Sequence, residues 1–263
     1  MHNLKTVISV TILFLTVNIF AGGVIKVKSS NPDGSSITED IMYVQDGKIR
    51  FESNDPADKS VTIFDTKNGK MINIDLTDNT YMIITKDDFK KFARKIAEVK
   101  KKQEEMINQL PEEQRAMMKQ MLEKQMEQMK NPPKTEYNKK GSESVNGYDC
   151  DIYEGIKKGE KVEELWVASW NELKFKDEYV RVFEGMKDFF MEMADNMGEL
   201  GGMMENEFDS EIFDKGFPVK TIEYENGQPV RIETIEEVTD SNLSSTLFEI
   251  PEGLTKTDPF EDM

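Results

Sequence analysis

Short apolar runs, rich in β-branched residues, alternate with polar positions along the first third of the chain, from Gly23 to Thr85. This alternation is typical of strands that bury one face. Pairs of turn residues separate the runs, among them Asp46-Gly47, Asn68-Gly69 and Asp78-Asn79. Such pairs supply the positive φ angles that tight hairpin turns require. The stretch therefore predicts an antiparallel meander.

The same pattern returns in two later stretches, residues 145–169 and 217–250, with turns at Lys158-Gly159 and Asn226-Gly227. We expect the last strand around Leu247 to Ile250. About ten strands result, which is too many for a small flat sheet and suits a curved one. The predicted fold class is α+β and mainly β: an antiparallel meander that forms an open, unclosed β-barrel.

Two long amphipathic helical insertions interrupt the strands, at about residues 86–130 and 177–205. Pro111 followed by two glutamates favours a new helix start, so the first insertion is predicted to be a helical hairpin broken near Leu110. Its first arm carries the apolar stripe Phe89, Phe92, Ala93, Ile96 and Val99, and its second arm carries Met117, Met118, Met121, Leu122, Met126 and Met129. The second insertion keeps apolar residues at helical spacing for about six turns.

The N-terminal residues 1–21 have the pattern of a secretory signal peptide: a lysine at position 5, an apolar stretch from Val7 to Phe20, and a small residue, Ala21. We expect cleavage there, and a single open-barrel domain at 22–263 that is periplasmic or secreted. No later stretch has the length and apolarity of a transmembrane helix. Cys150 would then be a lone thiol in an oxidising compartment, interpreted as a small buried strand residue.

Composition narrows the possible functions. The formal net charge is −17, which disfavours binding to nucleic acid and to anionic lipid surfaces. The only histidine, His2, lies in the predicted signal peptide, so the remaining chain lacks an imidazole for a catalytic triad or a metal site. No phosphate-binding loop or nucleophile motif occurs. We therefore predict a protein that is not an enzyme and needs no cofactor.

Methionine is concentrated in the helical insertions, which hold 12 of the 17 methionines. Three interpretations are open: ordinary core packing, the roof of a hydrophobic cavity that receives an acyl chain or apolar peptide, and thioether ligation of Cu(I). Copper is least favoured because the methionines are spread among Lys and Glu. The candidate ligand-binding lid is Phe183, Met186, Phe189, Phe190 and Met193, with Met118 and Met121 opposite.

Three segments resemble a bacterial periplasmic family of unknown function, DUF4412: Val145 to Tyr153 (VNGYDCDIY), Glu164 to Ala168 (ELWVA), and Phe217-Pro218 through to Gly253. That family is similar to the lipoprotein-localisation carriers (LolA/LolB-like), in which helices cover an unclosed antiparallel barrel. The resemblance implies a fold more than a function. Arginine is scarce here and the insertions are long, so carriage of lipoproteins themselves is not expected, and no family site residue is transferred.

Two functional hypotheses follow from these patterns. In the first, the protein is a non-enzymatic periplasmic binding or carrier protein that holds a lipid or acyl ligand between a curved sheet and Met- and Phe-rich helices. In the alternative, it is an envelope interaction or structural module that docks a protein partner through the helical hairpin and holds no small ligand. Neither hypothesis involves nucleic acid.

Overall fold

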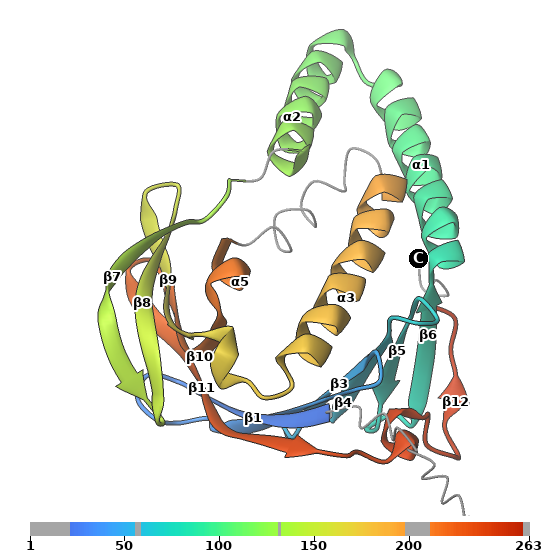
Figure 1. Ribbon diagram of the computed structural model, residues 1–263. Coiled ribbons are helices and arrows are strands. Elements are labelled where there is room, and N and C mark those ends of the chain that lie inside the picture. Colours follow the sequence, from blue (N-terminus) through green and yellow to red (C-terminus); the bar gives the residue numbers. More distant parts are fainter. Residues whose placement is uncertain (1–21, 56–58, 131–132, 198–210, 260–263) are drawn as a thin grey trace, which may run out of the picture.

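The computed structural model describes residues 22–55, 59–130, 133–197 and 211–259, without the side chains of residues 125–130 and 197. The predicted signal peptide and the end of the second insertion, from residue 198, lie outside these ranges. Twelve strands form one sheet that curves into a deep cup (Figure 1). The strands are β1 (Gly22–Ser30), β2 (Thr38–Gln45), β3 (Lys48–Ser53), β4 (Ser60–Asp65), β5 (Lys70–Asp75), β6 (Thr80–Thr85), β7 (Glu136–Val145), β8 (Tyr148–Lys157), β9 (Glu160–Ala168), β10 (Phe217–Glu225), β11 (Gln228–Ser241) and β12 (Thr255–Lys256).

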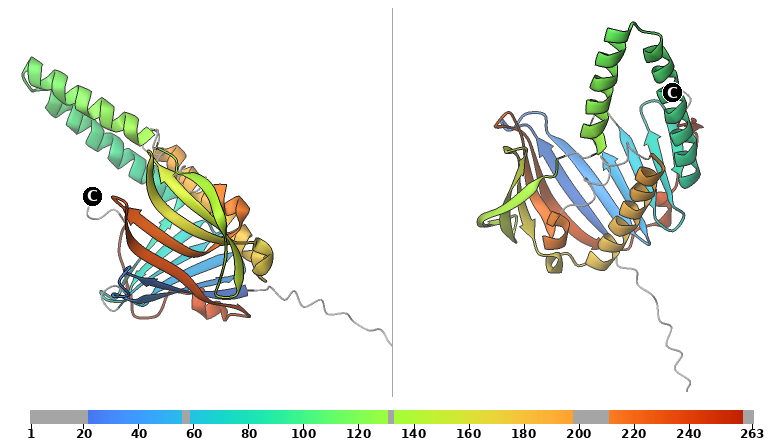
Figure 2. Two further views of the ribbon diagram at one scale, coloured as in Figure 1. Left: turned by 90° about the vertical axis from the view of Figure 1, so that its left-hand side faces the viewer. Right: turned by 90° about the horizontal axis from the view of Figure 1, so that it is seen from above.

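The sheet order is β12-β6-β5-β4-β3-β2-β1-β11-β10-β9-β8-β7, and every pair is antiparallel except β12 with β6. Strand β1 lies near the middle and joins the two halves: Ile25 faces Met42 of β2 on one side and Val238 of β11 on the other. The edges, β7 and β12, do not pair with each other, so the barrel is open (Figure 2). The predicted fold class is confirmed.

The predicted turn residues have the required backbone geometry. Asp46 and Gly47 have φ of 55° and 74°, and Asn226 and Gly227 have φ of 50° and 74°. Asparagine, aspartate and glycine tolerate this left-handed region better than other residues. These two turns therefore fix the hairpins β2–β3 and β10–β11 where the sequence predicted them.

Three details of the strand prediction were wrong, and one of them is the short strand β12, because no strand was expected beyond Ile250. Strand β7 was missed, because its sequence is polar and both of its faces are largely exposed, so no apolar alternation marks it. The strand expected around Leu247 to Ile250 is instead a short 3-10 helix, Ser245–Phe248. Its side chains pack on the outer face of the sheet, and this contact replaces strand pairing.

The helices take two different positions relative to the cup. Helix α1 (Lys86–Asn108) and helix α2 (Glu112–Lys130) form the predicted hairpin, which projects from the rim beside β6. Thr85 caps α1 through a reciprocal pair of hydrogen bonds with Asp88. Helix α3 (Lys176–Met197) lies inside the cup, across the concave face of the sheet, and the short α5 (Glu211–Lys215) lies near β9 (Figure 1).

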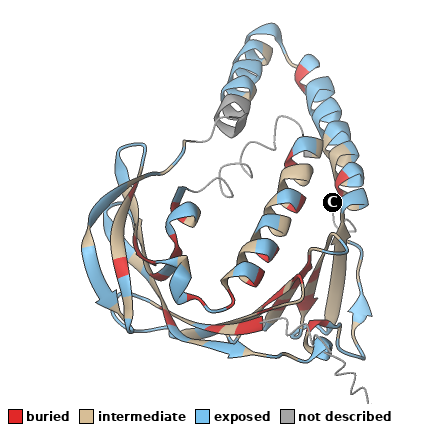
Figure 3. Ribbon diagram, in the orientation of Figure 1, coloured by how far each residue is buried: buried red, intermediate tan, exposed pale blue. Residues whose placement is uncertain are grey.

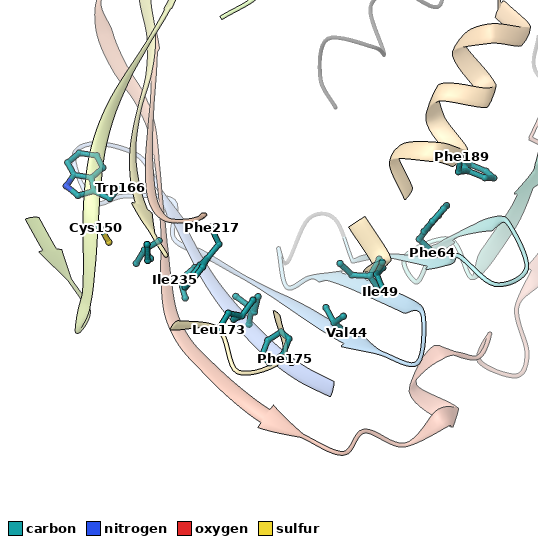
Figure 4. Packing of buried hydrophobic residues seen from close by; sticks show 14 of the residues in the cluster. Val44, Ile49, Phe64, Cys150, Trp166, Leu173, Phe175, Phe189, Phe217 and Ile235 are labelled. Atoms are coloured by element: carbon teal, nitrogen blue, oxygen red, sulfur yellow. The ribbon is translucent and has the colours of Figure 1, made fainter. Parts of the chain in front are cut away.

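The core has two layers on opposite faces of the sheet. On the concave face, α3 packs on strands β2 to β5, and buried residues line the inner side of the helix (Figures 3 and 4). On the convex face, Phe248 and its neighbours cover a cluster of branched side chains, namely Val61, Ile63, Ile72 and Ile74. Strand β4 is therefore packed on both faces, with Phe64 on the concave side and Val61 and Ile63 on the convex side.

The 3-10 helix Ser245–Phe248, which covers the convex face, is held by one buried cation, Arg50. Its Nη1 donates to the Leu247 carbonyl at 3.1 Å, and its Nε and Nη2 donate to Glu52 at 3.1 and 3.0 Å. Arg50→Met should lower the free energy of unfolding by about 1–3 kcal/mol, because two acceptors lose their donor. Urea unfolding would measure this. Lys26→Met, which removes an exposed ion pair with Glu237, is the control and should cost far less.

Candidate functional site on the concave face of the sheet

Helix α3 is anchored over the concave face by one aromatic side chain. The Phe189 ring is 5.0 Å from the Phe64 ring of β4 and 4.7 Å from the Phe89 ring of α1, in edge-to-face contacts. Gly185, one turn earlier, lies so close to Thr66 that a Cβ there would come within 2.7 Å of it. Phe189 therefore joins the sheet, α1 and α3 in one packed unit. Figure 4 shows its ring beside that of Phe64.

The segment that leads into α3 is fixed at two more points. The backbone N–H of Gly47 donates to the buried carboxylate of Glu178, which also pairs with Arg181. The Phe175 ring lies on Gly23 of β1, where a Cβ would come within 2.0 Å of the ring. These contacts place the N-terminal turns of α3 above the junction of β1, β2 and β11.

Two adjoining pockets lie at that junction. The first has a volume of about 180 Å³ and lies between the sheet and the start of α3. The second has a volume of about 440 Å³ and lies over β1 to β4. Both include Val27, Met42 and Glu233 in their walls, so they adjoin each other, and the two pockets together are called the trough. The apolar residues of the trough are Ile25, Val27, Ile41, Met42, Phe51, Leu173, Phe217, Pro218, Val219 and Ile235.

The first pocket is lined mainly by apolar residues, whereas six of the ten residues that line the second are polar: Asp40, Glu52, Ser53, Ser60, Thr62 and Glu233. Burial raises the pKa of Tyr179 to about 12, so the phenol is neutral at physiological pH. Its side chain lines the first pocket. Glu233, at the boundary between the pockets, is paired with Arg231 at 2.7 Å and accepts a hydrogen bond from Ser29. The composition of the first pocket, mainly apolar with a few polar groups, is usual for a small-molecule site.

The chemical groups available in the described ranges do not suggest other sites. No group of three His, Cys, Asp or Glu residues there could hold a metal ion. Cys150 lies in the core, where desolvation raises the pKa of its thiol, so the reactive thiolate is disfavoured. This placement agrees with the interpretation of Cys150 as a small buried strand residue.

The structure separates the sequence-predicted site residues into three environments. Phe189 is an almost completely buried anchor, whereas Met186, Phe190 and Met193 pack on the same core with part of their surface exposed. Phe183 stacks on Phe213 with a ring separation of 4.2 Å. Met118 and Met121 lie on α2 and are 44% and 61% exposed. The walls of the two pockets include none of these seven residues.

The trough residues were recognised in the sequence as strand residues but not as a site. Ile25 and Val27 belong to β1, Met42 to β2 and Ile235 to β11, and they share the concave face only because β1 pairs with both neighbours. The pairing of β1 with β11 joins segments about 200 residues apart in the chain, so no local sequence pattern could predict it. Tyr179 begins the apolar stripe of α3, and Phe217 and Pro218 belong to a family motif, but the sequence assigned none of them to a site.

The geometry defines a class: an open antiparallel half-barrel with an apolar trough partly covered by a helix. Residues 87–254 match the family described as a domain of unknown function, DUF4412. The match covers more than half of the chain, so the chain belongs to this family, and the resemblance inferred from the motifs is confirmed. No curated protein matches the sequence. No helix of the described ranges combines the length and apolarity needed to cross a membrane.

Several solved structures are similar in fold at low identity. An uncharacterized conserved protein from Thermus thermophilus is 9% identical, with a TM-score of 0.45 and 92% of each chain covered. A putative outer membrane lipoprotein-sorting protein domain from Vibrio parahaemolyticus is 9% identical, with a TM-score of 0.27, and 86% of this chain and 88% of that chain are covered. A LolA superfamily protein from Nitrosomonas europaea is 10% identical, with a TM-score of 0.23, and the shares covered are 88% and 90%.

Proposed function

We propose that the protein is a non-enzymatic periplasmic binding or carrier protein that holds an apolar ligand, a lipid or acyl chain, in the trough between the curved sheet and α3. The observation that carries this proposal is that the two pockets adjoin at Val27 of β1 and Met42 of β2, on the concave face of the sheet. The periplasmic location rests on the signal-peptide pattern of residues 1–21.

The energetics favour an elongated apolar ligand. Burying about 300 Å² of acyl chain would contribute roughly 7 kcal/mol before the costs of ordering the ligand are subtracted. The first pocket alone is smaller than most ligand sites, whereas the second is within their usual range of about 300–1,000 Å³. A chain-like ligand can use both because Val27 and Met42 line both.

The sequence-predicted lid has a narrower role in this proposal. Phe183, Met186, Phe190 and Met193 keep some exposed surface and would contact the part of a long ligand that extends beyond the trough. Phe189 would act indirectly, by holding α3 in place. Met118 and Met121 lie exposed on α2, outside the walls of both pockets, and have no role in this proposal.

Val27→Arg tests the trough directly. A guanidinium at the boundary of the two pockets would block both of them, and it can pair with Glu233 without unfolding the sheet. We expect at least a roughly tenfold loss of affinity for a fluorescent fatty acid, because the ligand would have to displace a charged group. Fluorescence titration measures the affinity, and native mass spectrometry of the purified protein shows whether lipid co-purifies.

The matched control is Val24→Arg, on the same strand but facing the convex side, opposite Tyr43. Val24→Arg adds the same charge, and its affinity for the fluorescent fatty acid should stay within about twofold of that of the unsubstituted protein. Equal uptake by the original protein and Val27→Arg, or no uptake by either, would reject the proposed site.

A further inference from the structure

The trough changes in polarity from one pocket to the other. The first pocket is lined mainly by apolar side chains, such as Ile25, Leu173 and Ile235. The wall of the second pocket is rich in oxygen atoms, with carboxylates at Asp40 and Glu233 and hydroxyl groups at Ser53, Ser60 and Thr62. None of the described residues that line the second pocket is Lys, Arg or His. A trough of this kind fits a ligand with one apolar and one polar end.

Strand pairing places the two carboxylates next to the boundary of the pockets. Asp40 of β2 lies directly opposite Val27 of β1, which lines both pockets. Met42, two residues after Asp40 and therefore on the same face of β2, also lines both. On the other side of β1, Glu233 lies opposite Ser29, which donates a hydrogen bond to it. The two carboxylates thus flank β1 on the concave face of the sheet.

Further glutamates extend this acidic wall across β10 and β9. Arg231, two residues before Glu233 on the same face of β11, lies directly opposite Glu223, and Glu223 lies opposite Glu163. Arg231 pairs with Glu233 at 2.7 Å. Together with Asp40, these side chains comprise four carboxylates and one guanidinium, so their formal charge is −3. The potential of such a wall attracts cations and repels anions.

Glu52 also borders the second pocket but does not add to this charge. Its carboxylate accepts hydrogen bonds from the buried Arg50, which also donates to the Leu247 carbonyl on the convex face. The charge on the concave face therefore comes from Asp40, Glu233 and the glutamates of β9 and β10.

We propose that the ligand of the trough is an amphiphile whose head is a protonated amine. Its aliphatic chain occupies the first pocket, where burial of a charged head would be costly. Its ammonium group meets Asp40 in the second pocket, because an ammonium donates three hydrogen bonds and the wall there offers carboxylate and hydroxyl acceptors. This inference rests on the proposed function and names the class of its ligand.

Isothermal titration calorimetry with three compounds that share a dodecyl-length chain tests the head group. Dodecylamine is cationic, monolaurin is neutral and dodecanoate is anionic, and each is used below its micelle concentration. We expect dodecylamine to bind about tenfold more tightly than dodecanoate, with monolaurin between them, since one attraction gained and one repulsion avoided at a partly exposed wall are each worth roughly threefold. The preference should shrink as ionic strength rises.

Substitutions in the wall should change this preference in opposite directions. Asp40→Asn should weaken dodecylamine binding about threefold, and Asp40→Lys should reverse the order, so that dodecanoate binds more tightly than dodecylamine. Arg231→Gln should strengthen dodecylamine binding, because it removes a positive charge from the wall. The matched control is Glu39→Gln, at the neighbouring exposed residue, which lies opposite Lys28 and faces the convex side. It removes the same charge as Asp40→Asn and should leave the order and spacing of the three affinities unchanged.

The outcomes separate the head group from the trough itself. Equal binding of dodecylamine and dodecanoate would leave the trough as an apolar site and overturn the inference about the head. Tighter binding of dodecanoate, lost in Arg231→Gln, would make that guanidinium the partner of an anionic head and would overturn it too. If none of the three compounds binds, the proposed function fails, and this inference fails with it.

Discussion

Phe189→Ala should lower the free energy of unfolding by about 3–5 kcal/mol, the range typical of a large buried aromatic side chain. Phe189 contacts rings from β4 and α1, so its removal leaves a cavity where three elements meet. Urea unfolding followed by circular dichroism would measure the loss. Hydrogen exchange should show α3 opening before the sheet, because the helix is held mainly by this cluster.

The neighbouring Phe190 provides the control. It is on the same helix turn but is only partly buried, and its ring is 6.4 Å from the Phe64 ring. Phe190→Ala should therefore cost clearly less than Phe189→Ala. Equal losses would show that α3 is held by its overall apolar stripe, and Phe189 would then have no special role as an anchor.

The sequence predicted the local part of this fold well. Hairpin turns such as Asp46-Gly47 and the helix break near Leu110 depend on residues close together in the chain, and both were predicted correctly. Strand β7 was not predicted, because strand patterns are visible only where one face is buried. The sequence also left open whether the helices cover the sheet, and the structure shows one of each kind: α3 covers it and α1–α2 projects.

The candidate site was less predictable than the fold. A stripe of apolar residues on a helix is the same whether it faces a core or a ligand, so Phe189 was indistinguishable from its neighbours. The trough depends on how β1 is placed between β2 and β11, and this follows from pairing over long sequence distances. Likewise, the sequence could not show that Tyr179 is a buried, neutral phenol in the wall of the first pocket, because its burial depends on residues far from it in the chain.

Gly23→Ala should lower the free energy of unfolding by about 2–3 kcal/mol, which is large for the addition of one methyl group. The new Cβ would come within 2.0 Å of the Phe175 ring, which is almost completely buried and cannot move without disturbing the core. Overpacking of this kind typically costs about 1–3 kcal/mol. Gly141→Ala, in strand β7, is the control: nothing lies within 4 Å of the added methyl group, and stability should change little.

A double-mutant cycle would show that the cost arises from this one contact. In a Phe175→Ala background the same Gly23→Ala substitution should cost less than about 0.5 kcal/mol, because the clash is gone, and the difference between backgrounds is the coupling energy. Phe175 adjoins Leu173, which lines the first pocket, so the displaced ring should also weaken fatty-acid uptake. If stability falls equally in both backgrounds, the cost lies in the strand itself, and the link between the β1 glycine and the trough would be wrong.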